Sequence, residues 1–199
     1  MDWNRINIWT NTLYILIHSL SLSKQIRFGN LTYLEDSIRD AGSWIGIDCS
    51  YTSVLLDHPF GGRKVTFRRD PNKHFSDISA QIIKILIQDL VVILDEMMSE
   101  ILISYNEHAG LFPQSKIEKL ASHLDEKYIW AARGCLELVA ARNVLTHGGG
   151  RWNDRTIPIV ESFVLPPPKN GEKLSVGFSM LFRYRKAMRT FLNEANKDH

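Results

Sequence analysis

The segment from Ile78 to Tyr105 constrains the fold most, because it is long and mostly apolar but carries polar side chains at intervals. The side chains that interrupt it are Lys84, Gln88, Asp89, Asp95 and Glu96. A membrane-spanning helix needs about 20 consecutive apolar residues with few or no charges. We therefore expect a buried central helix, capped by Ser76 or Asp77 and reaching about Glu107, and no membrane span.

A second periodic segment begins at Leu124. Apolar or small residues recur there at alternating spacings of four and three, which indicates a core-facing helix. The first row is Tyr128, Ala131, Cys135 and Leu138, and it continues through Arg142 to Leu145. A parallel row is Ala132, Leu136, Val139, Asn143 and His147.

Other helices are predicted from spacing and capping signals. Residues 2–23 carry apolar side chains at helical spacing, and Thr32 with Glu35 forms a capping box for a short helix that ends near Gly42. Ser115 with Glu118 caps another helix, which bends near residues 123–125. A turn-rich connector contains residues 166–168 and 170–171, and a basic helix follows at about 178–196.

These elements predict an all-α fold, an up-and-down bundle of about five helices. The chain has 199 residues and 44% hydrophobic content, so it can bury a core as a single domain, 1–199. An irregular insertion at about 43–75 is rich in Gly, Asp and Ser. Within it, residues 64–68 alternate like a short strand, so the insertion could hold a short β-hairpin.

Composition limits the partners and the compartment. A net charge of +2 is too small for binding nucleic acid by bulk electrostatics, so such binding needs local clusters. Two cysteines make no disulfide framework, and the first residues lack an export signal, so we expect a cytoplasmic protein.

The predicted helix that begins near Leu124 ends in residues that suit metal-free RNA cleavage. Arg142, Asn143 and His147 place a cation, an amide and an imidazole at one helix end, and three glycines follow at 148–150. Histidine suits proton transfer because its unperturbed pKa lies near neutral pH. Arginine grips phosphate oxygens with a planar fork and stabilises charge in the transition state. The glycines let a phosphate backbone approach closely.

The spacing of these residues favours a site shared by two chains. Asn143 and His147 project within about 40° of each other, whereas Arg142 and His147 diverge by about 140° with about 7.5 Å of rise. A second copy of the helix across a two-fold axis could bring the missing cation to each phosphate. We therefore expect a homodimer.

The sequence Arg142-Asn143-Val144-Leu145-Thr146-His147 resembles the signature of the HEPN superfamily, in which an Arg, a polar residue, three residues and a His end a bundle helix. The resemblance implies a dimeric helical domain, with Arg142, Asn143 and His147 as the catalytic set. Many members are metal-independent endoribonucleases of toxin–antitoxin, abortive-infection or other defence systems. Some carry a modified Tyr two residues beyond the His, where this chain has Gly149.

The expected function is therefore cleavage of single-stranded RNA by attack of the 2′-hydroxyl, which leaves a 2′,3′-cyclic phosphate. No metal or other cofactor is expected, and an antitoxin protein is a further expected partner. The alternative is a catalytically silent HEPN-like module that dimerises or binds a nucleotide or RNA. A further interpretation is that the motif is only a helix C-cap with no catalytic function. In that case His147 contacts the last carbonyls of the helix, Gly148 adopts the left-handed cap conformation and Arg142 forms a surface ion pair.

Other residues could extend an RNA-binding surface. Arg151 and Arg155 flank Trp152, a pattern suited to phosphate contact and base stacking, although Trp152 could equally dock on the core. Basic clusters occur at residues 63–74 and 183–189, and charge runs are usually just solvated. Glu96 and Glu100 could bind a metal, but a solvated helix face is the preferred interpretation. Residues 69–74 have the same pattern as the motif: an Arg, a polar residue, three residues and a His. Pro71 predicts that this second copy lies in a loop.

Overall fold

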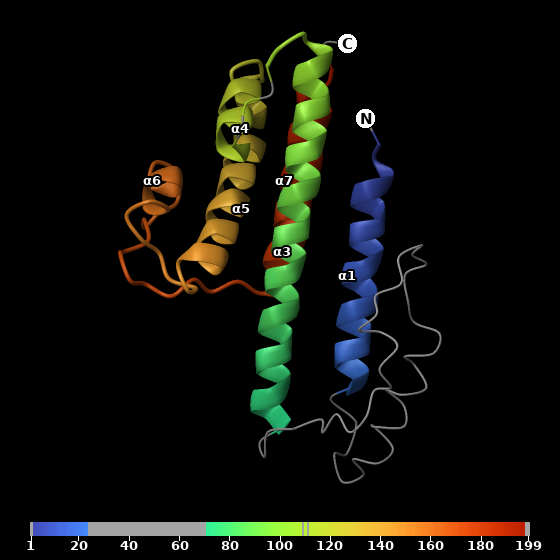
Figure 1. Cartoon of the computed structure of the whole chain (residues 1–199), viewed down its shortest axis with the longest axis vertical. Helices are drawn as coiled ribbons and strands as arrows, with labels where there is room; N and C mark the ends of the chain where they lie inside the picture. Colours follow the sequence, from blue (N-terminus) through green and yellow to red (C-terminus); the bar gives the residue numbers. More distant parts are fainter. Residues whose placement is uncertain (1, 24–70, 109, 111, 198–199) are drawn as a thin grey trace, which may run out of the picture. The chain divides into compact units, whose positions relative to one another are not determined.

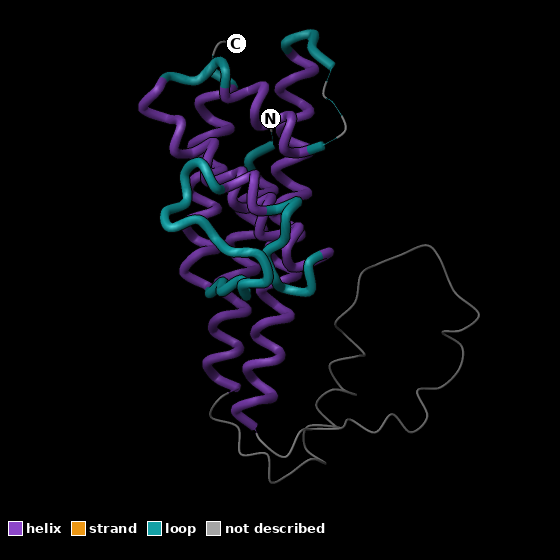
Figure 2. The backbone as a smooth tube through the Cα atoms, turned by 90° about the vertical axis from the view of Figure 1, so that its left-hand side faces the viewer, coloured by secondary structure: helices purple, strands orange, loops and turns teal. Residues whose placement is uncertain are grey.

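The computed structural model describes residues 2–23, 71–108, 110 and 112–197. The chain divides into two units, residues 1–17 with 79–199 and residues 18–78, and only the first is described almost in full. The described residues form six α-helices and one 3-10 turn, with no strand (Figure 2). The prediction of an all-α bundle is confirmed. The helix predicted at 32–42, the strand at 64–68 and most of the insertion at 43–75 lie outside the described residues.

Four long helices run alongside one another: α1 (Asn4–Ser23), α3 (Pro71–Ser104), α5 (Ile129–His147) and α7 (Phe178–Ala195) (Figure 1). Between them the chain forms α4 (Pro113–Ala121), the 3-10 turn η2 (Glu126–Tyr128) and the short α6 (Ile157–Val160). The bend predicted at residues 123–125 separates α4 from η2. The final helix lies where the sequence predicts it.

Side-chain contacts join α1 to its neighbours in the first unit. The Trp9 indole donates to the backbone oxygen of Leu86 at 3.1 Å, which joins α1 to α3. Arg185 Nε donates to Thr10 Oγ1 at 2.6 Å, which joins α7 to α1. Arg5 Nη1 lies 2.8 Å from a Glu100 oxygen and 3.5 Å from a Glu96 oxygen. Glu96 and Glu100 therefore pair with an arginine, and the described residues hold no cluster of three or more metal-binding side chains.

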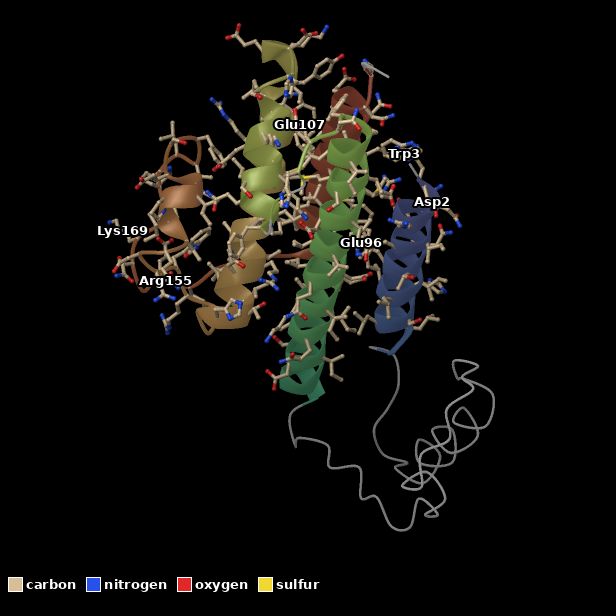
Figure 3. The ribbon with its side chains drawn as sticks, turned by 45° about the horizontal axis from the view of Figure 1, so that its top comes forward. Asp2, Trp3, Glu96, Glu107, Arg155 and Lys169 are labelled. Carbon is tan, nitrogen blue, oxygen red and sulfur yellow. The ribbon has the colours of Figure 1, made fainter. Side chains whose placement is uncertain are left out.

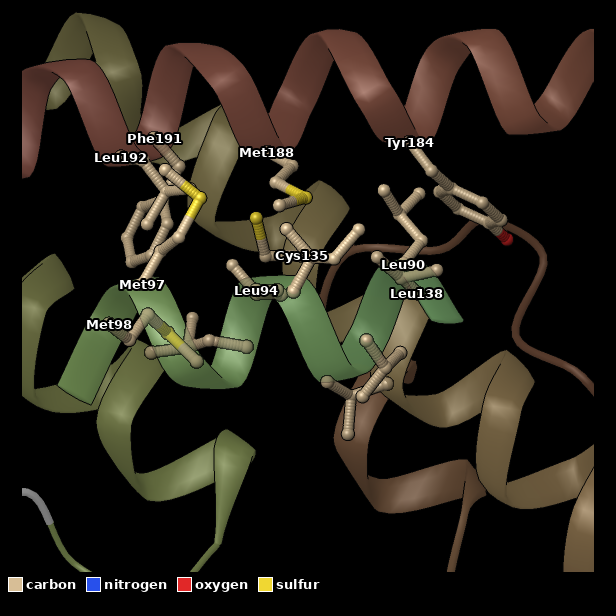
Figure 4. Close-up of a cluster of buried hydrophobic side chains, with 14 of the residues drawn as sticks. Leu90, Leu94, Met97, Met98, Cys135, Leu138, Tyr184, Met188, Phe191 and Leu192 are labelled. Atoms are coloured by element: carbon tan, nitrogen blue, oxygen red, sulfur yellow. The ribbon is translucent and has the colours of Figure 1, made fainter. Parts of the chain in front are cut away.

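The core lies where α1, α3, α5 and α7 meet. Figure 4 shows the part of it that α3, α5 and α7 form. The buried side chains drawn there include Leu94, Met97, Cys135, Leu138, Met188 and Phe191. Burial raises the pKa of the Cys135 thiol, so this residue packs as a small apolar side chain, as its place in the helical row predicts. The central helix α3 is part of this core, and none of the helices described here is long and apolar enough to cross a membrane.

Helices α5 and α7 pack closely against each other at Gly134. A Cβ atom placed on Gly134 would lie 2.5 Å from the Cβ of Ala187, so the absence of a side chain allows the two backbones to pack at this distance. Glycine inside a helix costs about 1 kcal/mol relative to alanine. The close contact explains why glycine occurs here despite that cost.

Two helix starts differ from the sequence prediction. Helix α3 begins at Pro71 rather than at Ser76 or Asp77, because proline is tolerated in a first helical turn, where its missing N–H has no partner in any case. Residues 71–74, the end of the second copy of the motif, are therefore helical, and the predicted loop is wrong for them. Arg69 and Asp70 lie outside the described residues. Helix α3 also ends at Ser104, short of the predicted Glu107.

Helix α4 likewise begins at Pro113, two residues before the predicted cap at Ser115. The Ser115 hydroxyl donates backward to the oxygen of Phe112 at 2.8 Å, and Glu118 accepts from Gln114 Nε2 at 2.9 Å. The predicted capping box is therefore wrong, because both of its side chains have other partners.

A buried ion pair joins α4 to α3. Lys116 Nζ lies 2.8 Å from Asp95 Oδ1 and donates to Ser99 Oγ at 2.9 Å. The Lys116 side chain is only 5% exposed, whereas that of Asp95 is 32% exposed. An ammonium group at this depth depends on these two oxygens for its stability.

Glu137 on α5 gives the fold a pH dependence. Burial raises the pKa of Glu137 above its ordinary value of 4.5, and a hydrogen bond from the Tyr184 hydroxyl at 3.2 Å and the charge of Arg183 only partly offset this. A raised carboxyl pKa contributes stability that is complete below pH 4.5 and is lost as pH rises through the folded-state pKa.

Glu137→Gln should therefore unfold at a higher urea concentration than the wild type at neutral pH. The amide oxygen can still accept from Tyr184, and no charge has to be buried. The difference should disappear in acid below pH 4.5, where Glu137 is protonated in both states. Urea titrations followed by circular dichroism at the two pH values measure it, and a difference that does not change with pH would contradict this interpretation.

Candidate functional site

The last two turns of α5 carry the three residues singled out by the motif. Apolar side chains upstream on α5, including Cys135, Leu138 and Val139, are buried and hold the helix against the bundle. Arg142 and Asn143 are half-buried, and His147, the last helical residue, is exposed. Packing of α5 therefore fixes the backbone that presents the motif at its end.

A hydrogen bond joins two of the three side chains. Arg142 Nη1 donates to Asn143 Oδ1 at 3.0 Å. The helical positions alone leave Arg142 to one side, and this bond draws its guanidinium toward the side of the helix that carries Asn143. Asn143 in turn lies one helical turn before His147. The structure thus brings Arg142 and Asn143 into contact, with His147 one turn further along the chain.

His147 has no bonded partner in the described part of the chain. Its imidazole makes no hydrogen bond and no ion pair there, and Arg142 likewise makes no ion pair with any described carboxylate. The imidazole is therefore open to solvent and available to a ligand. These observations differ from what the helix C-cap interpretation expects, which is that His147 contacts the last carbonyls and that Arg142 is ion-paired.

The glycine turn completes the helix end without using His147. The amides of Gly148 and Gly150 both donate to the carbonyl of Val144, each at 3.0 Å. Gly148 has an ordinary φ of −93°, and the left-handed conformation belongs to Gly149 and Gly150, at 60° and 79°. A Cβ on Gly148 would collide with the backbone oxygen of Arg151, whereas nothing lies within 4 Å of a Cβ placed on Gly149 or Gly150. The backbone at residues 149 and 150 is therefore open to an approaching group.

Trp152 docks on a second, smaller core. It is 8% exposed and packs with Ala140, Val144 and Val160. Its backbone donates to the oxygen of Glu172 and accepts from Gly171, both at 2.9 Å. The indole therefore helps to anchor the segment after the glycines, and its ring is covered rather than free for base stacking.

Arg151 and Arg155 remain exposed on this segment. Arg151 Nη1 donates to the oxygen of Gly171 at 2.8 Å, so its guanidinium is partly committed to the fold. Figure 3 shows Arg155 and Lys169 on the side of the molecule that carries α6. Of the basic cluster at 63–74, residues 63–70 lie outside the described part.

One residue near the site was not predicted to contribute. Gln88 of α3 donates from Nε2 to Thr146 Oγ1 at 3.2 Å, which ties α3 to the turn that carries His147. In the sequence, Gln88 stands out only as a polar interruption of an apolar run. That interruption was a usable signal, because a polar side chain on a central helix needs a partner. The candidate residues also lie outside a cleft of about 440 Å³ that α4, α5 and α6 form.

No family model, curated protein or solved structure matches the chain. The candidate site therefore rests on its own geometry and on the resemblance of its motif.

Proposed function

We propose that this chain is a metal-independent endoribonuclease that cleaves single-stranded RNA, with Arg142, Asn143 and His147 as its catalytic residues. The observation that carries the proposal is the Arg142–Asn143 hydrogen bond one turn before an exposed, unbonded His147. This arrangement offers a cation for the phosphate and an imidazole for proton transfer on a backbone held by the core. The resemblance of the motif to the HEPN signature supports a role in a toxin or defence system, with an antitoxin protein as partner.

In the proposed reaction, neutral His147 accepts the proton of the ribose 2′-hydroxyl. The 2′-oxygen then attacks the adjacent phosphorus, and the bond from phosphorus to the 5′-oxygen breaks. An imidazolium returns a proton to the leaving 5′-oxygen, so that the products are a 2′,3′-cyclic phosphate and a free 5′-hydroxyl. Arg142 binds the non-bridging oxygens, whose negative charge is stabilised as the transition state forms.

A single 2′-deoxy substitution at the mapped cut site should stop cleavage at that linkage and at no other. The reason is that the nucleophile belongs to the substrate, so its removal leaves nothing to attack the phosphorus. Gel mapping of the fragments measures this, and the unmodified RNA serves as the control. Continued cleavage at the modified linkage would mean that water is the nucleophile. A chain that binds RNA but cleaves neither the modified nor the unmodified RNA would favour the catalytically silent binding module.

The proposed site also predicts a symmetric homodimer in solution. A two-fold axis beside the end of α5 would place two His147 side chains near one phosphate, one to accept a proton and one to donate it. Sedimentation velocity at micromolar concentration should therefore give about twice the mass of the chain. A monomer at that concentration would require Arg142 and His147 to act within a single chain.

A further inference from the structure

Helix α7 carries a row of exposed cations. Arg183, Lys186 and Arg189 follow one another at three-residue spacing, and all three are exposed. None of them forms an ion pair with a described carboxylate. They span about 9 Å along the helix axis. Glu194, the one carboxylate of α7, is engaged by Lys197 at 2.6 Å. The outer side of α7 is therefore strongly positive although the whole chain is nearly neutral.

Two tryptophans flank this row, one on α5 and one just before α1. Lys186 Nζ lies 6.0 Å from the ring centre of Trp130 on α5, and Trp130 is 46% exposed. Arg189 Cζ lies 5.7 Å from the ring centre of Trp3, just before α1. Both are cation–π distances. We call Arg183, Lys186, Arg189, Trp3 and Trp130 the α7 face.

A cleft of about 430 Å³ opens beside Trp3, which Figure 3 shows next to the start of α1. Its lining combines an indole, a guanidinium, a hydroxyl, an amide and a carboxylate, from Trp3, Arg189, Thr190, Asn193 and Glu194. A volume of this size suits a small planar ligand. A nucleobase can stack on the indole or on the guanidinium plane, while the amide and hydroxyl meet its polar edge.

We infer that the α7 face binds single-stranded nucleic acid, with one base in the cleft beside Trp3, a second base stacked on Trp130, and the flanking phosphates on Lys186 and Arg183. Cations that track the backbone and aromatic rings that stack the bases are the two features that such surfaces combine. A duplex hides its bases, so the rings favour a single strand. An anionic membrane fits less well, because the apolar side of α7 is buried in the core and cannot enter lipid. The inference goes beyond the proposed cleavage site and does not require cleavage.

The test measures binding of a labelled single-stranded DNA oligonucleotide, which has no 2′-hydroxyl for the proposed cleavage. Fluorescence anisotropy is recorded over a range of salt concentrations. Arg183→Gln/Lys186→Gln should raise Kd about 10-fold or more at low salt. It should also reduce the slope of log K against log salt by about 1.4, because each phosphate contact to a single strand contributes about 0.7. The matched control, Lys119→Gln/Lys127→Gln, removes two charges from α4 and η2 and should leave the slope unchanged.

A second variant separates stacking from charge. Trp130→Ala should raise Kd by at least about 5-fold with little change in the salt slope, since stacking on an aromatic ring carries no charge. Equal loss in the α7 and control variants would overturn the inference, because it would indicate bulk attraction. Wild-type chain that binds no single strand at low salt, binds a duplex as tightly, or binds only vesicles of anionic lipid would overturn it too. A wild-type chain that binds the single strand in this way but cleaves no RNA would contradict only the proposed function.

Discussion

Replacement of His147 by alanine should lower the rate of RNA cleavage by about 100-fold to 10,000-fold, the contribution expected of a group that transfers protons in the transition state. His147 is exposed and its imidazole is bonded to no described residue, so its removal should leave the fold unchanged. Single-turnover cleavage of a fluorescent RNA measures the rate, and circular dichroism checks the fold. A chelator should not inhibit the wild type, because no metal is part of the proposed reaction.

The matched control is His123→Ala, which removes an exposed imidazole from the turn between α4 and η2. It should cleave RNA at the wild-type rate. Equal activity of the His147 variant and the His123 variant would remove His147 from the reaction. Cleavage by the wild type only when a divalent metal is added would contradict the mechanism as a whole.

Lys116→Met should destabilise the fold by about 3 kcal/mol, which makes it the largest change in stability that we predict. The substitution keeps the length of the side chain but leaves Asp95 and Ser99 without the ammonium that they share. Asp95 is partly exposed, and water can replace some of the lost interaction, so we expect the lower end of the range for a broken buried pair. Urea denaturation measures the free energy of unfolding.

Lys119→Met is the control for this experiment, because Lys119 lies on the same helix and pairs with Glu107 at 2.5 Å while its side chain is 41% exposed. An exposed pair contributes less than about 1 kcal/mol. The double change Asp95→Leu with Lys116→Met should recover much of the loss, since it removes both charges together. A loss from Lys116→Met no greater than that from Lys119→Met would show that the buried pair contributes little.

The long helices could be predicted from the sequence because their burial is periodic. The rows through Ala131, Cys135 and Leu138 are buried as expected, and their period follows from helix geometry alone. Helix starts were predicted less well. Pro71 and Pro113 both open helices two or more residues before the predicted caps, because proline at a first turn competes successfully with a Ser or Asp cap further along. Helix α6 has four residues, too few for any periodic signal.

The position of the candidate site along the chain could be predicted from the sequence, but the contacts between its side chains could not. Spacing places Asn143 and His147 on one side of α5. The contact of Arg142 with Asn143 depends on the conformation of a long side chain, which spacing does not determine. The burial of Trp152 depends on Val144 and Val160, which meet only after the chain has turned through the glycines. The Gln88–Thr146 bond joins residues 58 positions apart, and no local pattern encodes such a contact.

The close contact of Gly134 with Ala187 also bears on how this sequence can vary. Between positions 134 and 187 there is room for only one methyl group, and the side chain of Ala187 occupies it. Substitution of Gly134 by alanine alone should push the helices apart, whereas the exchange of the two residues, alanine at 134 and glycine at 187, would preserve the total volume. Homologous chains should therefore show the sizes of these two residues changing in opposite directions. The same contact fits α5 against α7 thirteen residues before His147, so it helps to set the position of His147 along the bundle.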